Sequence, residues 1–352
     1  MTTAPQSREF FRALESLRGI AALGIVIFHI AWTFPLYDLN LIRNSYLMVD
    51  LFFVLSGFVI CHSYGDRIET GRDVARFIWV RLGRLYPLHL ILLFVFLAIE
   101  IAKHIAEVKF GLVANRKAFT SNNTFSFMSN LLLIQALGLH DNVTYNLPAW
   151  SSTEFYTYLL FSGILFLLKK RVALVFASGL LIAASITLDS GEIRHMIFRC
   201  LEGFFMGVIA YQCYVALSKR QVHDCEYGWH KDMLGIFSLA GLVVFLSMKG
   251  DGGYDVLMLP LVAILILSIA ATPKGLLSTI LEVAPLAWVG KVSYSIYMVH
   301  MAVIWCISQV LRVGLKTPQV IDGKGDPLFT PPPLTASPFL TAPIPPLLFV
   351  SP

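Results

Sequence analysis

The most regular feature of the chain is a series of long apolar runs separated by short polar segments. A helix needs about 20 mostly apolar residues to cross the hydrocarbon core of a bilayer. Nine runs of 16 to 23 residues are candidate spans; they cover residues 13–34, 46–64, 86–105, 150–168, 172–188, 197–217, 233–248, 254–270 and 291–313. Two shorter apolar stretches, 128–139 and 276–289, are expected to be re-entrant or interfacial pieces. The pattern therefore predicts an all-α integral membrane protein, a polytopic helical bundle with nine clear spans.

The pattern changes at the end of the chain. Residues 318–352 hold 10 of the 17 prolines. Proline has no backbone N–H group and disrupts a helix, so this stretch is not expected to cross the bilayer as a regular helix. We therefore divide the chain into a membrane domain at 1–316 and a Pro-rich tail at 317–352.

Composition agrees with a membrane protein. Hydrophobic residues make up 57% of the chain and charged residues only 14%, whereas soluble proteins average about 25% charged residues. The formal net charge is +5, but the cations lie in short runs between apolar segments. They form no single basic patch, so no nucleic acid is expected as a partner. The five cysteines have no metal-ligand spacing, and no metal site is expected.

The distribution of the cations predicts the orientation in the membrane. Lys and Arg are enriched in the cytoplasmic loops of membrane proteins. Alternate segments between the runs carry Arg8 and Arg12, the arginines of 67–84, the "KKR" of 169–171, and Lys219, Arg220 and Lys231. All of these lie on one side if the N-terminus is cytoplasmic. We therefore expect a multi-pass protein of the cytoplasmic (inner) membrane.

The first run contains two ionisable residues, Arg18 and His29. Their separation of eleven residues is close to three helical turns, so both side chains share one face, about 16 Å apart along the axis. Ionisable groups within a membrane are costly and usually mark function. The structural alternatives are an arginine that anchors the helix at the interface and a neutral histidine bonded to a neighbouring helix.

Two acidic residues are candidate partners for His29. Asp50 begins the second run, and Glu154 lies about one turn into the fourth run, with Tyr158 four residues later on the same face. A carboxylate can orient an imidazole and stabilise its cation. Asp50 could instead be a helix-start acid that the helix dipole favours.

Further polar residues of the runs have functional and structural interpretations. Arg81 and Arg84 share a helix face, and two guanidinium groups suit phosphate, although without further context cytoplasmic anchoring is the favoured explanation. Arg199 lies three residues before Glu202 and could form an intrahelical ion pair. His300 follows a tyrosine at the same spacing, so a hydrogen-bonded structural pair and a site are both possible.

Five stretches together resemble one family. They are "LESLRGIAALGIVIFH", "VDLFFVLSGFVI", "RLGRLYPLHL", "LPAWSSTEFYTYLLF" and "GKVSYSIYMVH", and in this order they resemble the acyltransferase-3 family of integral membrane O-acyltransferases. The resemblance implies a bundle of about ten helices that transfers an acyl group, often acetyl. The donor would be cytoplasmic acyl-CoA, with no permanently bound cofactor. The acceptor would be a hydroxyl of an extracytoplasmic or lipid-linked glycan.

The resemblance also implies roles for individual residues. His29 would be the catalytic histidine, Glu154 the acid of a tryptophan-serine motif, and Arg81 and Arg84 would help to hold the donor. Arg18 belongs to the same motif as His29, and we group it with the donor-binding residues. We add Asp50 to the catalytic candidates. Tyr158, Arg199 and His300 are expected to contact the substrate.

The chain departs from the family pattern at two places. The stretch "WSSTE" is one residue shorter than the usual Trp-Ser-x-Ser-x-Glu, so Trp150 should be rotated relative to Glu154. The expected tenth helix is degenerate or missing, since the Pro-rich tail stands in its place. Two alternatives therefore remain open. One is a secondary transporter of a glycan precursor or acidic metabolite, and the other is an inactive relic.

Overall fold

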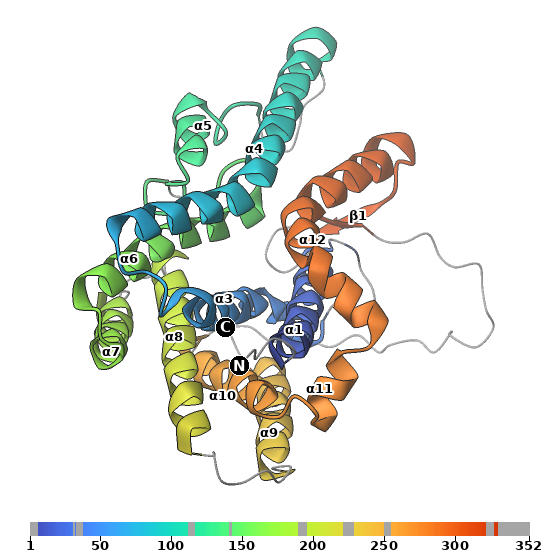
Figure 1. Cartoon of the computed structure of the whole chain (residues 1–352). Helices are drawn as coiled ribbons and strands as arrows, with labels where there is room; N and C mark the ends of the chain where they lie inside the picture. The colour runs from blue at the N-terminus through green and yellow to red at the C-terminus, as the bar shows by residue number, and fades with distance from the viewer. Residues whose placement is uncertain are drawn as a thin grey trace, which may run out of the picture.

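The protein is built almost entirely of helices (Figure 1). The computed structural model describes residues 6–30, 32, 38–111, 117–140, 143–188, 196–220, 229–249, 255–321 and 327–329. Its α-helices are α1 (Gln6–Phe28), α2 (Asn40–Arg43), α3 (Met48–Tyr64), α4 (Gly71–Phe110), α5 (Thr124–Leu131), α6 (Glu154–Leu168), α7 (Arg171–Leu188), α8 (Met196–Arg220), α9 (Trp229–Met248), α10 (Met258–Ala271), α11 (Leu276–Leu281) and α12 (Ala284–Gln309). Short helical turns are η1 (Ser45–Leu47), η2 (Leu147–Thr153), η3 (Asp255–Leu257) and the π-turn η4 (Val310–Gly314). The prediction of an all-α membrane protein is confirmed.

The exact number of nine spans is not confirmed. Within the described residues, seven helical segments are long and apolar enough to cross a membrane: Asn40–Tyr64, Gly71–Phe110, Leu147–Leu168, Arg171–Leu188, Met196–Ser218, His230–Met248 and Ala284–Arg312. The other two predicted runs form α1, which carries charged residues through its first half, and α10, which has only 14 residues. Both are helical, but neither meets the length and composition of a span.

Helix α4 contains more than the predicted run at 86–105. Its 40 residues correspond to roughly 60 Å at 1.5 Å per residue, about twice the thickness of a bilayer core. Thr70 caps its start, because its hydroxyl accepts from the Asp73 N–H and its own N–H donates to the Asp73 carboxylate. Pro87 lies inside the helix, and α4 changes direction along its length (Figure 1). A proline removes one intrahelical hydrogen bond and accounts for such a bend.

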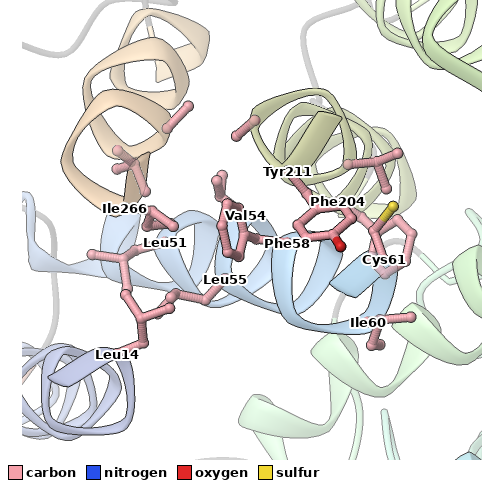
Figure 2. Close-up of a cluster of buried hydrophobic side chains, with 14 of the residues drawn as sticks. Leu14, Leu51, Val54, Leu55, Phe58, Ile60, Cys61, Phe204, Tyr211 and Ile266 are labelled. Carbon is pink, nitrogen blue, oxygen red and sulfur yellow. The ribbon is translucent and has the colours of Figure 1, made fainter. Parts of the chain in front are cut away.

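Glycines allow α3 and α8 to pack closely in the centre of the molecule. A Cβ atom on Gly57 would lie 1.8 Å from the Phe204 carbonyl oxygen, and one on Gly207 would lie 2.0 Å from the Val54 oxygen. Small residues commonly mediate helix contacts in membranes, because apolar burial offers little driving force there. The buried cluster around this contact includes Phe58 (Figure 2).

A second glycine contact allows α1 and α12 to pack closely. A Cβ on Gly19 would lie 2.7 Å from the Gly290 nitrogen, and a Cβ on Gly290 would lie 2.3 Å from the Glu15 oxygen. Further along both helices, His29 contacts His300. The two helices therefore run in the same direction. We call the end at which α1 terminates the His29 end of the bundle.

The described part of the Pro-rich tail contains a two-stranded antiparallel sheet. Strand β1 (Gln319–Ile321) pairs with β2 (Pro327–Phe329), and Phe329 also forms a bridge with Trp32. Residues 330–352 lie outside the described residues. The division of the chain into a domain at 1–316 and a tail at 317–352 stays a prediction.

Candidate active site

Five of the predicted site residues line one cavity. Arg18 comes from α1, Arg81 and Arg84 from α4, and Glu154 and Tyr158 from α6. The cavity encloses about 810 Å³ of empty space, part of which is open to the outside. We call it the arginine cavity. Further lining side chains come from α3, η2 and α12 and include Ser56, Ser151, Ser152, Ser293, Tyr294 and Tyr297.

The turn η2 orients the acidic residue of this cavity. Pro148 sits at its start, and α6 begins at Glu154, so Tyr158 follows one turn later on the same face. Trp150 does not line the cavity but packs against Phe53, with ring centroids 5.6 Å apart. The shortened "WSSTE" stretch therefore leaves the tryptophan and the glutamate on different faces.

Glu154 is half-buried, and its carboxylate lies near hydroxyl and guanidinium groups. The hydroxyls of Ser56 and Tyr158 and the cations of Arg18 and Arg81 are the polar groups that act on its carboxylate. Its Oε1 atom is buried and has no hydrogen-bond partner among the described residues. Buried carboxylate oxygens are normally satisfied. Glu154 thus offers one free acceptor within a cationic surrounding.

Arg81 is held by aromatic rings. Its guanidinium lies over the rings of Tyr64, Phe77 and Tyr158, with distances of 5.0, 5.6 and 5.9 Å to their centroids. Its Nε atom is buried and has no partner among the described residues. Arg84, one turn later, is exposed. Arginine offers a planar fork of donors that matches phosphate, so these side chains could hold a phosphate-bearing molecule.

Asp50 and Arg199 form a buried ion pair away from the arginine cavity. Arg199 donates from Nε to Asp50 Oδ1 at 3.2 Å and from Nη2 to Oδ2 at 2.8 Å. Its guanidinium lies over the rings of Tyr46 and Trp150. The ion pair of Arg199 is therefore with another helix, not with Glu202 of its own helix as considered above. Both oxygens of Asp50 are engaged by this arginine.

A further charged residue, Lys249, lies beside this ion pair and was not among the predicted site residues. Lys249 donates to the Tyr46 hydroxyl at 3.1 Å and pairs with Asp255 at 3.0 Å. Burial disfavours the lysine cation, but these partners outweigh burial and raise the pKa of Lys249. The signal available in the sequence was a lysine directly after the apolar run 233–248 and an aspartate at the start of the next run, 254–270.

His29 is paired with a second histidine. Its Nδ1 atom lies 2.9 Å from the Ile25 carbonyl oxygen and 3.3 Å from Nε2 of His300. None of the ring contacts found for His29 within the described residues is with a carboxylate. This differs from the expectation that Asp50 or Glu154 orients the ring. Among the described residues, no three His, Cys, Asp or Glu side chains gather as a metal site.

Neighbouring turns of α12 line two different cavities. Tyr297 lines the arginine cavity, and His300 comes one turn further along α12. His300 also lines a second cavity, which has about 780 Å³ of empty space when the part open to the outside is included. The other residues lining that cavity are apolar and come from α12 and the end of α1, with Trp32. His300 thus lines the apolar cavity and lies one helical turn from a residue that lines the arginine cavity.

Comparison with known proteins agrees with this arrangement of motifs. Protein 2 in the picA locus of Rhizobium radiobacter is 33% identical over 156 residues, which are 43% of this chain and 78% of that protein. O-acetyltransferase OatA of Staphylococcus aureus is 24% identical over 323 residues (85% and 51%). Peptidoglycan O-acetyltransferase OatA of Listeria monocytogenes is 22% identical over 344 residues (88% and 52%).

The chain spans about half the length of the two O-acetyltransferases. No solved structure matches it. The model of the acyltransferase-3 family, described as an acyltransferase domain, matches residues 11–343. This match extends over all five motifs and every residue of the candidate site. The chain therefore belongs to the acyltransferase-3 family.

Proposed function

We propose that the protein is a membrane O-acyltransferase that moves an acyl group, most simply acetyl, from cytoplasmic acyl-CoA to a hydroxyl of a glycan. The acceptor would be an extracytoplasmic or lipid-linked sugar. In this proposal, α1 begins on the cytoplasmic side and the His29 end of the bundle faces the opposite side. Support comes from the family and from relatives that are named O-acetyltransferases.

One observation carries the proposal: three arginines converge on a cavity whose wall continues to the histidine pair. Acyl-CoA carries several phosphate groups on one end of a long, thin arm. Arg18, Arg81 and Arg84 would bind the phosphates from the cytoplasmic side, because guanidinium groups bind phosphate through paired hydrogen bonds. The arm would then extend along the face of α12 that bears Tyr297 toward His300 and His29.

His29 would act as the general base. Its Nε2 atom would take the proton of the acceptor hydroxyl while that oxygen attacks the thioester carbonyl. A tetrahedral intermediate then collapses, the carbon–sulfur bond breaks, and the departing thiolate takes the proton back from His29. The products are the glycan ester and free CoA, and no further reactant is needed.

Glu154 would have a different role from the one expected from the sequence. Its carboxylate interacts electrostatically with Arg18 and Arg81 and would help to keep these cations in position. Its free oxygen is an acceptor for an amide N–H, a group that the pantetheine arm of CoA carries. In this proposal Glu154 binds the donor and does not orient His29.

The test is acyl transfer by the purified protein in lipid nanodiscs. Acetyl-CoA is the donor, and the acceptor probes are a soluble peptidoglycan fragment and a polyprenyl-linked N-acetylglucosamine. We expect CoA release that depends on the acceptor, together with an acetylated product seen by mass spectrometry. His29→Ala should lower turnover by about 10²–10⁴-fold, the usual contribution of a general base.

The matched control is His89→Ala, which removes another buried histidine, bonded to the Asn130 oxygen at 2.8 Å. It should retain turnover once corrected for folded protein. Undiminished turnover in His29→Ala would overturn the role of His29. Counterflow of the sugar in proteoliposomes without acetyl-CoA, and no acetylated product, would instead favour a transporter.

A further inference from the structure

We propose that His300 is a positioning residue that fixes the ring and the tautomer of His29 through a hydrogen bond from His29 Nδ1 to His300 Nε2. The two nitrogens are 3.3 Å apart and the ring centroids 5.0 Å apart. His300 is buried, with 5% of its surface exposed. This inference rests on the proposed function, because it concerns the base of that reaction.

The backbone around the two rings determines where their protons lie. His29 Nδ1 is 2.9 Å from the Ile25 carbonyl oxygen, and His300 Nδ1 is 2.6 Å from the Tyr297 carbonyl oxygen. A carbonyl oxygen only accepts, so each Nδ1 must carry a proton and donate it. A neutral imidazole then has its lone pair on Nε2. His300 consequently presents an acceptor to His29, and Nε2 of His29 is left as the base.

The opposite assignment leaves more groups unsatisfied. If His300 Nε2 carried the proton and donated to His29 Nδ1, neither Nδ1 of the neutral rings could donate to its carbonyl oxygen. Two short contacts, at 2.9 and 2.6 Å, would then place lone pairs against each other. The network therefore favours a His29 N–H shared between the Ile25 oxygen and His300.

This arrangement would contribute most when His29 becomes charged. As His29 takes the proton of the acceptor hydroxyl, its Nδ1–H becomes a stronger donor, and Nε2 of His300 accepts from it. A carboxylate has the same task in a catalytic triad. Here the partner is neutral, so His29 stays neutral between turnovers. Its Nε2 lone pair is then free to accept a proton, as a base requires.

The proposal predicts a difference between two substitutions of similar polarity. A glutamine side chain can bring its amide oxygen to the place of Nε2, whereas asparagine is one methylene shorter. We expect His300→Phe to lower kcat for acetyl transfer about 10–100-fold, as loss of an orienting partner commonly does. The KM for acetyl-CoA should change less than about twofold. His300→Gln should recover part of kcat, and His300→Asn should recover less.

A double substitution separates this role from the alternatives. If His300 acts only through His29, adding His300→Phe to His29→Ala causes no further loss, because residues that act as a unit are not additive. Additive losses, a raised KM with unchanged kcat, or equal recovery by Asn and Gln would overturn the proposal. His89→Phe is the control for a buried histidine. If wild-type protein transfers no acetyl group, or His29→Ala keeps full turnover, it is the proposed function that fails.

Discussion

The two acids predicted for the site, Asp50 and Glu154, have opposite surroundings. Asp50 is bonded through both oxygens to one arginine, whose guanidinium is itself covered by two aromatic rings. Glu154 shares its cavity with three arginines, yet keeps one buried oxygen without a hydrogen bond in the described structure. From the sequence alone both acids are candidate partners of His29, with a helix-start alternative for Asp50.

The difference shows which acid is available to a substrate. A carboxylate whose two oxygens are both bonded inside the protein has no free oxygen for a substrate. Its removal leaves the partner cation buried and unpaired. A carboxylate with a free acceptor beside a cavity is poised to bind a ligand. We therefore assign Asp50 a structural role and Glu154 a functional one, and the predictions below test that assignment.

The largest effect is expected from Asp50→Ala, on stability. It leaves the Arg199 guanidinium buried without its carboxylate, and breaking a buried pair in this way costs about 3–5 kcal/mol in the free energy of unfolding. Thermal unfolding in detergent, followed by tryptophan fluorescence, measures the loss. Replacing both partners, in Asp50→Leu with Arg199→Met, should restore most of it. A single variant as stable as the wild type would contradict the structural role.

The next effect is expected from Glu154→Gln, on turnover. The amide keeps the size of the side chain but removes the negative charge between the arginines. We expect acetyl transfer to fall about 100-fold, roughly 2.7 kcal/mol, while the melting temperature changes little. Asp50→Asn is the paired control and should show the reverse, with lower stability and less change in turnover per folded protein. The same profile for both variants would remove the distinction between the two acids.

A smaller effect is expected when one arginine of the cavity is replaced. Arg81→Lys keeps the charge but loses the planar group that stacks on Tyr64, Phe77 and Tyr158. We expect the KM for acetyl-CoA to rise about tenfold with kcat nearly unchanged, because donor binding is weakened. Arg84→Lys, at an exposed position, should raise KM less. An effect on kcat alone would show that Arg81 does not bind the donor.

The smallest effect concerns Lys249 at the edge of the Asp50 pair. The pKa of this lysine is raised in the folded protein, so its stabilisation is fully present below its unfolded pKa, about 10.4. The stabilisation is lost as pH rises through the folded pKa. Lys249→Met should therefore lower the melting temperature equally at pH 7 and pH 9 and less above about pH 10.5. Lys274→Met, at an exposed lysine, should leave the melting temperature unchanged at each of these pH values.

Helical periodicity was sufficient to predict which of the cavity residues share a helix face. Spacings of three or four residues correctly placed Arg81 with Arg84 and Glu154 with Tyr158 on shared faces, and all four side chains line one cavity. These predictions hold because each depends on a single helix. The helices themselves follow from apolar composition, although their ends and the number of spans do not.

Contacts between helices could not be predicted in the same way. Nothing in the chain indicates that Asp50 meets Arg199, or that His29 meets His300. Such pairs depend on which helices are neighbours and at what height they touch. Without an alignment of relatives, spacing along the chain holds no information on either question. The partners of Asp50 and His29 were therefore unpredictable, although the residues themselves were identified.

The glycine contact between α1 and α12 adds a constraint on length. Gly19 precedes His29 by ten residues, and Gly290 precedes His300 by ten residues. Two parallel helices that touch at the glycines therefore bring the histidines to equal height, about 15 Å further on. The meeting of the rings is thus set by counting residues along two backbones. Substitutions between glycine and histidine should leave this height unchanged wherever the helices persist. A single insertion or deletion between the glycine and the histidine of either helix would rotate one ring by about 100° and separate the two histidines.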